Sequence, residues 1–84
     1  MVVRTIKTNV NEADSLLNNK ISFIFRSDKD CIKEGDIIQF LCMRDRRSVL
    51  HRINNKSFVV TRVMDSMTAP LLKGYQVIGI RQMV

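Results

Sequence analysis

The 84-residue sequence has no tryptophan, one histidine, two cysteines and one proline. A structural zinc site needs four Cys or His ligands, and Cys31, Cys42 and His51 supply only three, which excludes such a site. We expect both cysteines to be reduced thiols. No apolar run is long enough for a transmembrane helix, and residues 1–14 lack the apolar stretch of a secretory signal, so a cytoplasmic protein is expected. Without an internal repeat or a linker, residues 1–84 are predicted to form a single domain.

Common catalytic and nucleotide-binding motifs are missing as well. The sequence contains no GxxxxGK[ST], HExxH, GxSxG or GxGxxG, so no cofactor and no metal are predicted. Ser48, His51 and Asp45 are the one set from which a Ser–His–Asp arrangement could be drawn, but closeness in sequence does not give triad geometry. We expect His51 to be a partly buried structural residue. No catalytic residue is predicted.

One helix and several strands are predicted from the pattern of apolar residues. Asn9 followed by Glu12 is typical of a helix N-terminus, and apolar residues at helical spacing continue to the Asn18–Asn19 pair, where the helix should stop. Strands are expected at 2–7, 21–26, 37–43, 49–53, 57–64 and 75–81, with a turn at Glu34–Gly35–Asp36. Short strands at this spacing predict a mainly β (α+β) fold, a small partly closed β-barrel of five or six strands with one N-terminal helix.

The positive charge is confined to one half of the chain. Residues 1–42 hold six basic and six acidic side chains, whereas residues 43–84 hold eight basic and two acidic ones, which accounts for the net charge of +6. Four arginines are concentrated in RDRRSVLHR (44–52), namely Arg44, Arg46, Arg47 and Arg52. Arginine binds phosphate through two parallel hydrogen bonds, so this segment is a candidate phosphate clamp. The alternative is a solvated turn in which Asp45 pairs with a neighbouring arginine.

Aromatic residues are few, and we assign them to the core. The four phenylalanines, Phe23, Phe25, Phe40 and Phe58, all fall in predicted strands, with Phe23 and Phe25 on the face opposite Ile24. Buried phenylalanines would leave no aromatic platform for single-stranded nucleic acid. Charge and shape recognition of structured RNA is therefore favoured.

Residues 20–36, KISFIFRSDKDCIKEGD, resemble the ASCH domain of the PUA-like superfamily, in its short bacterial and phage-associated subfamily. Arg26 aligns with the arginine of the family motif GxKxxExR, and Gly35–Asp36 with the family's GD turn. FVVTRV (58–63), LLKGY (71–75) and YQVIGI (75–80) follow in the family's order, so the resemblance covers nearly the whole chain. It implies a PUA-like barrel that binds RNA, with Lys20 and Arg26 in a cleft beside the motif strand.

The sequence departs from this motif at the positions that carry chemistry. Asn19, Ile21 and Ile24 stand where the motif has glycine, lysine and glutamate, although Lys20 lies next to the lysine position. Some ASCH-like proteins are similar to amidohydrolases that use a lysine, a hydroxyl and a glutamate, and isoleucine cannot exchange a proton. We therefore expect a noncatalytic RNA-binding module. Two alternatives stay open: a small phage- or mobile-element-encoded inhibitor that binds an acidic surface of a host protein, and a nucleoside-modifying amidohydrolase that depends on Lys20.

Overall fold

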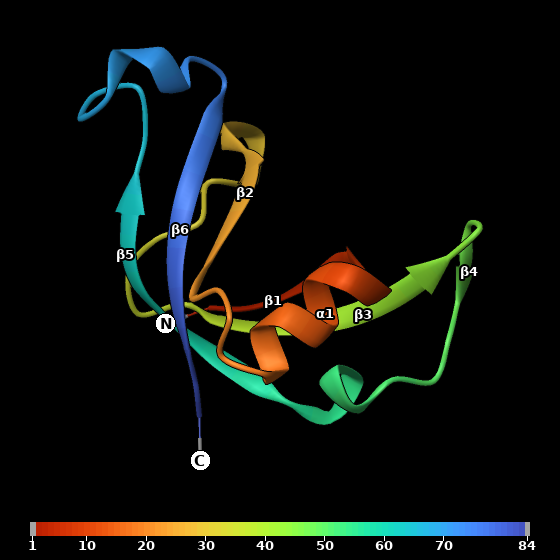
Figure 1. Ribbon diagram of the computed structural model, residues 1–84. Coiled ribbons are helices and arrows are strands. Elements are labelled where there is room, and N and C mark those ends of the chain that lie inside the picture. The colour runs from red at the N-terminus through yellow and green to blue at the C-terminus, as the bar shows by residue number, and fades with distance from the viewer. Residues whose placement is uncertain (1, 84) are drawn as a thin grey trace.

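Six strands form one curled sheet that closes to a half-barrel in a computed structural model, which describes residues 2–83 (Figure 1). The strands are β1 (Val3–Asn9), β2 (Phe23–Ser27), β3 (Ile37–Arg44), β4 (Arg47–Ser48), β5 (Ser57–Met64) and β6 (Tyr75–Gln82). The helix is α1 (Val10–Leu17), and short 3₁₀ turns follow at Asp28–Asp30 (η1), Arg52–Asn55 (η2) and Pro70–Leu72 (η3). The predicted mainly β fold with one N-terminal α-helix is confirmed.

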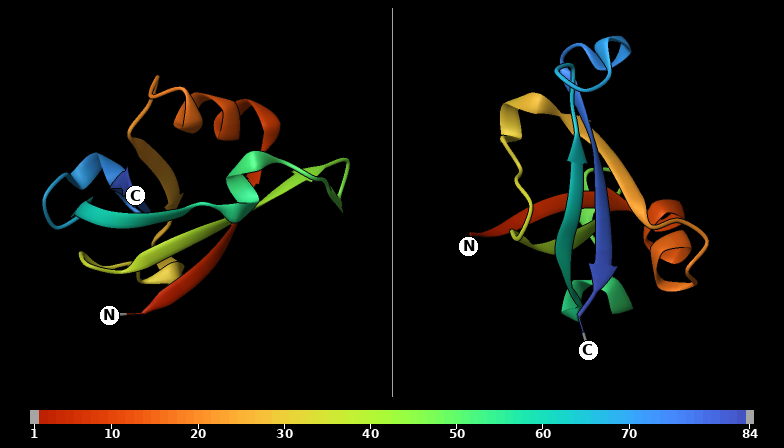
Figure 2. Two further views of the ribbon diagram at one scale, coloured as in Figure 1. Left: turned by 90° about the horizontal axis from the view of Figure 1, so that it is seen from below. Right: turned by 90° about the vertical axis from the view of Figure 1, so that its left-hand side faces the viewer.

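The order of strands across the sheet is β1-β3-β5-β6-β2, with β4 added to the end of β3. β1 and β3 run parallel and the other pairs are antiparallel. β1 and β2 are thus the two ends of the sheet, and the curl turns them toward one another, as the views in Figure 2 show. We call the gap between these two end strands the seam.

The helix begins and ends where its sequence predicts. The side chain of Asn9 accepts a hydrogen bond of 2.7 Å from the backbone N–H of Glu12, which satisfies one of the free donors of the first turn. Beyond the C-terminus of α1, Asn19 has a φ of 57°, the left-handed conformation that asparagine tolerates well. Ala13 and Leu16 of α1 are buried in the core.

The core lies inside the half-barrel. It is formed by β2, β3, β5 and β6, by α1 and by two connections. Its buried members are Ala13, Leu16, Ile24, Ile32, Ile38, Phe40, Cys42, Ile53, Phe58, Val60, Ile78 and Ile80. Ile32 and Ile53 belong to connections rather than strands, so these connections are anchored by apolar burial. Cys42 is buried and Cys31 exposed, and both are free thiols.

The prediction for the faces of β2 is wrong. Ile24 is 1% exposed and lies in the core, whereas Phe23 and Phe25 are 51% and 50% exposed on the outer face. All three side chains are apolar, so alternation alone could not decide which face is inward. Phe40 and Phe58 are buried as predicted and meet edge to face, with ring centroids 5.2 Å apart.

One prediction for the charged middle of the chain is also corrected. The strand predicted at 49–53 is absent, because residues 49–51 carry no ladder pairing and η2 begins at Arg52. β5 contains a register shift between Val60 and Arg62. This bulge places Arg62 opposite Gly79 on the outer face and turns Val63 toward Ile78.

Candidate nucleic-acid interface

Three of the four clustered arginines lie on one hairpin that projects from the body of the molecule (Figure 1). Arg44 at the end of β3 is the register partner of Arg47 in β4, and Asp45–Arg46 form the two-residue turn between them. The side chains of Arg44, Asp45, Arg46 and Arg47 are all exposed. We call residues 44–47 the basic hairpin. Like charges directly opposite each other on paired strands are destabilising, so this arrangement is unfavourable for folding and favourable for an anion.

The turn of the basic hairpin also has an uncommon backbone. Asp45 and Arg46 have φ values of 50° and 67°, as the tight two-residue hairpin turn requires at both central positions. Asparagine or aspartate followed by glycine is the usual choice for this turn, and a bulky residue at the second position is strained. Arg46 occupies the position where glycine would be the least strained residue.

Hydrogen bonds from Asn54 hold the return of the hairpin to the body. Its Oδ1 accepts from the Cys42 N–H at 2.8 Å and its Nδ2 donates to the Val49 carbonyl at 2.9 Å. The side chain thereby satisfies backbone groups that a regular strand would have paired, which accounts for the missing strand at 49–53. Sequence reasoning missed this role, because a single asparagine near a turn has no distinctive pattern.

His51 belongs to this support and not to a catalytic triad. Its Nδ1 accepts the Ile53 N–H at 3.1 Å, and its Nε2 lies 2.8 Å from Oδ1 of Asp14 on α1. With Nδ1 accepting from the backbone, neutral His51 donates from Nε2 to Asp14. Neither ring nitrogen is bonded to Ser48, and the carboxylate partner is not Asp45, so the Ser–His–Asp arrangement is excluded. His51 is a partly buried structural residue, as expected.

Arg52 and Lys20 lie apart from the hairpin turn. Exposed Arg52 is the first residue of η2 and lines a pocket of about 390 Å³ with Asn18, Lys56 and three further residues. Lys20 is exposed in the connection from α1 to β2, where its N–H donates to the Ser15 carbonyl. The pocket over the seam that contains Arg26 is not lined by Lys20.

Arg26 crosses the seam and joins β2 to β1 and α1. Its guanidinium donates to the Glu12 carboxylate at 2.6 and 3.3 Å, to the Lys7 carbonyl of β1 at 3.1 Å and to the Phe25 carbonyl at 2.8 Å. Thr8 donates its hydroxyl to the same carboxylate at 2.6 Å. Four of the five N–H donors of Arg26 are thus engaged inside the protein, which gives this side chain a structural function at the open edge of the sheet.

Arg4 ties β1 to the connection between β2 and β3. Its Nε pairs with the buried carboxylate of Asp36 at 2.9 Å, and its two terminal nitrogens donate to the carbonyls of Asp30 and Cys31 at 2.7 and 3.2 Å. β1 and β2 form no ladder with each other, so Arg26 supplies across the seam a hydrogen bond of the kind that a closed barrel would obtain from paired strands, and Arg4 adds bonds from β1 to the β2–β3 connection. No local pattern around Arg4 predicts this role.

A pocket of about 400 Å³ opens over the seam between these two arginines. It is lined by Arg4, Thr5, Ile6, Lys7, Arg26, Asp30 and Ile32. Lys7 is exposed and makes no ion pair within residues 2–83. The cationic lining makes this a candidate site for a phosphate or another small anion, although Arg4 and Arg26 are already neutralised by Asp36 and Glu12.

The two carboxylates that pair with these arginines, Glu12 and Asp36, are held in their charged form. Burial by itself raises the pKa of Glu12, but hydrogen bonds from Arg26 and Thr8 and the charge of Arg26 outweigh burial and leave that pKa below its ordinary value. Burial likewise raises the pKa of Asp36, and the Lys33 N–H together with Arg4 reverses the effect and lowers it. A carboxylate stabilised in this way is a poor general base near neutral pH.

Neither a metal centre nor a membrane span is found in the part of the chain that the structure describes. No three or more His, Cys, Asp or Glu side chains of residues 2–83 are grouped so that they could hold a metal ion. No helix among these residues is long and apolar enough to cross a bilayer.

Comparison with known proteins supports the fold and is silent on function. The sequence matches no protein-family model and no curated protein. Among solved structures, the crystal structure of the hypothetical protein PH0355 superposes with a TM-score of 0.63 and 12% sequence identity, over 99% of this chain and 100% of that one. At this identity the likeness concerns the fold alone, a curled β-sheet with one helix.

Proposed function

We propose that this protein is a noncatalytic RNA-binding module, and that the basic hairpin with Arg52 contacts the phosphates of structured RNA. The observation that carries the proposal is the distribution of ion pairs. Within residues 2–83 Asp36 and Glu12 pair with Arg4 and Arg26, Asp14 is bonded to His51, and no carboxylate pairs with an arginine of the basic hairpin. Asp45 makes no ion pair there either, so the solvated-turn alternative lacks the contact on which it depends.

The backbone of the hairpin turn supports the same proposal. Arg46 adopts a left-handed conformation that costs about 1–2 kcal/mol for a residue with a side chain. Strain of this kind persists where the strained side chain has a function. The group that Arg46 adds relative to glycine, and that can bind phosphate, is its guanidinium. The two-residue turn also brings three arginines within four residues of one another, so that their guanidinium groups can reach neighbouring phosphates of one backbone.

The resemblance to the ASCH domain adds to this proposal and also argues against catalysis. The position of the motif glutamate is Ile24, which is 1% exposed in the core and cannot transfer a proton. Glu12 and Thr8 place a carboxylate and a hydroxyl at the seam, but Thr8 is buried and Glu12 is neutralised by Arg26. A nucleoside-modifying amidohydrolase is therefore not favoured by the geometry of these residues.

The test is a binding measurement with matched charge changes. We expect the wild type to bind a fluorescently labelled RNA stem-loop at about 50 mM salt, where phosphate contacts are strong. The double variant Arg46→Gly, Arg47→Ala should bind at least about tenfold more weakly, since each charged hydrogen bond contributes about 1.5–3 kcal/mol at most and part is lost to solvent. Fluorescence anisotropy measures both affinities.

A control variant removes the same charge elsewhere. Lys33 and Lys73 are exposed and lie outside the basic hairpin, so Lys33→Ala, Lys73→Ala changes the net charge equally. This variant should lose less than half as much binding free energy as the hairpin variant. Equal losses would mean that net charge alone binds RNA. Failure of the wild type to bind RNA would refute the proposal and favour an acidic protein surface as the partner.

A further inference from the structure

The outer face of β2 and β6 carries three exposed aromatic rings. Phe23, Phe25 and Tyr75 are 51%, 50% and 49% exposed, and the rings of Phe25 and Tyr75 stack with centroids 5.1 Å apart at an interplanar angle of 18°. On a sheet with one face toward the core, outward positions are normally polar. Exposed aromatic groups of this size on a small protein indicate a contact surface.

The register of the strands puts these rings on one face of two neighbouring strands. Phe23 lies opposite Gly79 and Phe25 opposite Val77, while Tyr75 lies opposite Ser27 at the end of the same ladder. Because alternate residues point to opposite faces, all the rings stand on the outer face, and Phe23 and Phe25 are separated by about 6.6 Å along β2.

A shallow groove runs beside Phe23 on this face. Its volume is about 490 Å³, and its lining is mostly apolar, with Phe23, Met64, Val77 and Gly79 among its residues. Gly79 keeps the floor low, since a Cβ there would come within 3.1 Å of the Thr61 hydroxyl. The bulge in β5 supplies one rim of the groove.

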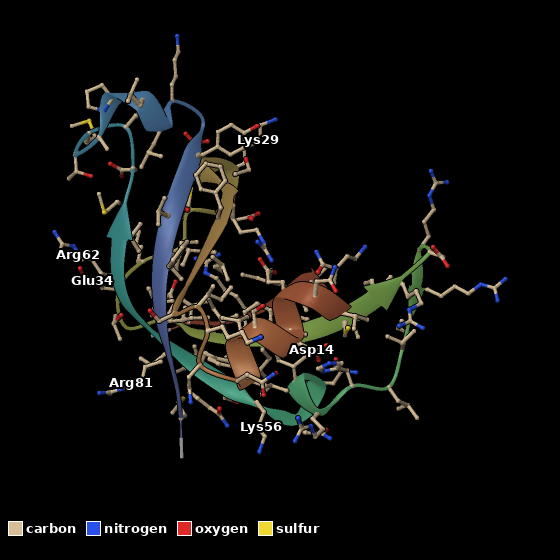
Figure 3. All side chains as sticks on the ribbon, in the orientation of Figure 1. Asp14, Lys29, Glu34, Lys56, Arg62 and Arg81 are labelled. Carbon is tan, nitrogen blue, oxygen red and sulfur yellow. The ribbon has the colours of Figure 1, made fainter. Side chains whose placement is uncertain are left out.

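Two arginines give this apolar groove a positive edge. Arg62 and Arg81 line it, are exposed, and extend away from the sheet into solvent (Figure 3). No carboxylate of residues 2–83 lies within ion-pair distance of either one, Glu34 included. We call Phe23, Phe25, Tyr75, Arg62 and Arg81 the aromatic face.

We propose that the aromatic face stacks unpaired bases of the RNA whose phosphates the basic hairpin contacts, an inference that rests on the proposed function. Aromatic side chains on the surface of a sheet stack successive bases, and arginines beside them attract the phosphates and stack on the bases in turn. The unpaired positive charge decides between occupants: an apolar protein surface would leave Arg62 and Arg81 without partners, whereas a nucleotide satisfies rings and guanidinium groups together. Burial of the phenylalanines, expected from the sequence, would have excluded this mode of binding.

The chain contains an internal reporter for this contact. Tyr75 is the only tyrosine and there is no tryptophan, so emission excited near the tyrosine band comes from the aromatic face alone. Addition of a short oligouridylate to the wild type should quench this emission in a saturable way. The same strand annealed to oligoadenylate should bind without comparable quenching, because its bases are paired. N-Acetyltyrosinamide corrects for absorption by the RNA.

Variants separate stacking from simple apolar contact. Phe23→Leu keeps an apolar side chain but loses the ring, and should weaken oligouridylate binding about fivefold or more while leaving duplex binding unchanged. Val3→Ala changes a similarly exposed apolar residue on β1, and should alter neither. The hairpin variant Arg46→Gly, Arg47→Ala should weaken both RNAs yet retain the full quenching at saturation.

Each other result has one meaning. If the duplex binds but oligouridylate does not quench the emission, the aromatic face is refuted and the basic hairpin is left intact. The same conclusion follows if the duplex binds and Phe23→Leu and the wild type bind oligouridylate with equal affinity. A concentration-dependent dimer in sedimentation experiments that Phe23→Leu dissociates, with RNA binding unchanged, would assign this face to a second copy of the chain and also refute it. No binding of either RNA refutes the proposed function, and this inference with it.

Discussion

Replacement of Arg26 by methionine should destabilise the protein substantially, because this arginine joins the two ends of the sheet. The change removes the ion pair with Glu12 and the hydrogen bond to the Lys7 carbonyl across the seam, while methionine retains most of the apolar stem. It leaves the Glu12 carboxylate with the Thr8 hydroxyl as its remaining side-chain donor within residues 2–83. The prediction therefore tests whether the half-barrel depends on this crossing.

The expected magnitude follows from the partial burial of the pair. Both side chains are 20% exposed. A surface ion pair contributes about 0–1 kcal/mol and disruption of a buried pair costs about 3–5 kcal/mol, and this pair lies between the two cases. We expect a loss of about 2–3 kcal/mol in the free energy of unfolding. For a domain of this size the melting temperature should fall by roughly 8–24 °C.

Urea unfolding followed by circular dichroism measures this change. Arg62→Met is the matched control, because Arg62 is exposed and makes no ion pair within the described chain, so its loss should cost less than about 0.5 kcal/mol. In a double-mutant cycle, Arg26→Met combined with Glu12→Gln should cost about 1 kcal/mol less than the sum of the single changes. Equal stability of Arg26→Met and the control, or additive effects in the cycle, would refute the role of the seam pair.

Three further predictions concern titration, backbone strain and thiol reactivity. Glu12 and Asp36 have pKa values below their ordinary ones, so the stability they contribute is complete above about pH 4.5 and is lost as the pH falls below it; thermal melts should show this loss, and Glu12→Gln should reduce it. Arg46→Gly should raise the free energy of unfolding by about 0.5 kcal/mol, because relief of the left-handed strain exceeds the entropy cost of glycine; a lower value in urea titrations would contradict this reasoning. A thiol reagent should modify exposed Cys31 readily and Cys42 only on unfolding, because Cys42 is buried and this burial is the main cause that raises the pKa of its thiol. Modification of two thiols in the native protein would contradict the burial.

Local signals made much of this fold predictable from the sequence. Asn9 and Glu12 marked the start of the helix, Asn19 its end, and Gly35, with a φ of 87°, the turn before β3. These features depend on neighbouring residues only, so a single sequence contains them. The half-barrel then followed from strand number and spacing.

The features that sequence could not predict depend on distant partners. The FIF segment of β2 is apolar on both faces, and only its pairing with β6 decides that Ile24 is inward. The ion pairs of Arg4 and Arg26 join residues 14 to 32 positions apart, which no local pattern reveals. In the candidate site, charge alone indicated that the clustered arginines would be exposed. The aromatic face could not be predicted, because it depends on which side of β2 faces outward.

The salt dependence of RNA affinity tests the central proposal most directly. If Arg44, Arg46, Arg47 and Arg52 each contact a phosphate, they contribute about −3 to −3.6 to the slope of log affinity against log salt concentration. The variant Arg46→Gly, Arg47→Ala should flatten the measured slope by about 1.5–2, with a similar loss for RNAs of different sequence. An unchanged slope in that variant, or no binding by the wild type at about 50 mM salt, would contradict phosphate recognition by the basic hairpin.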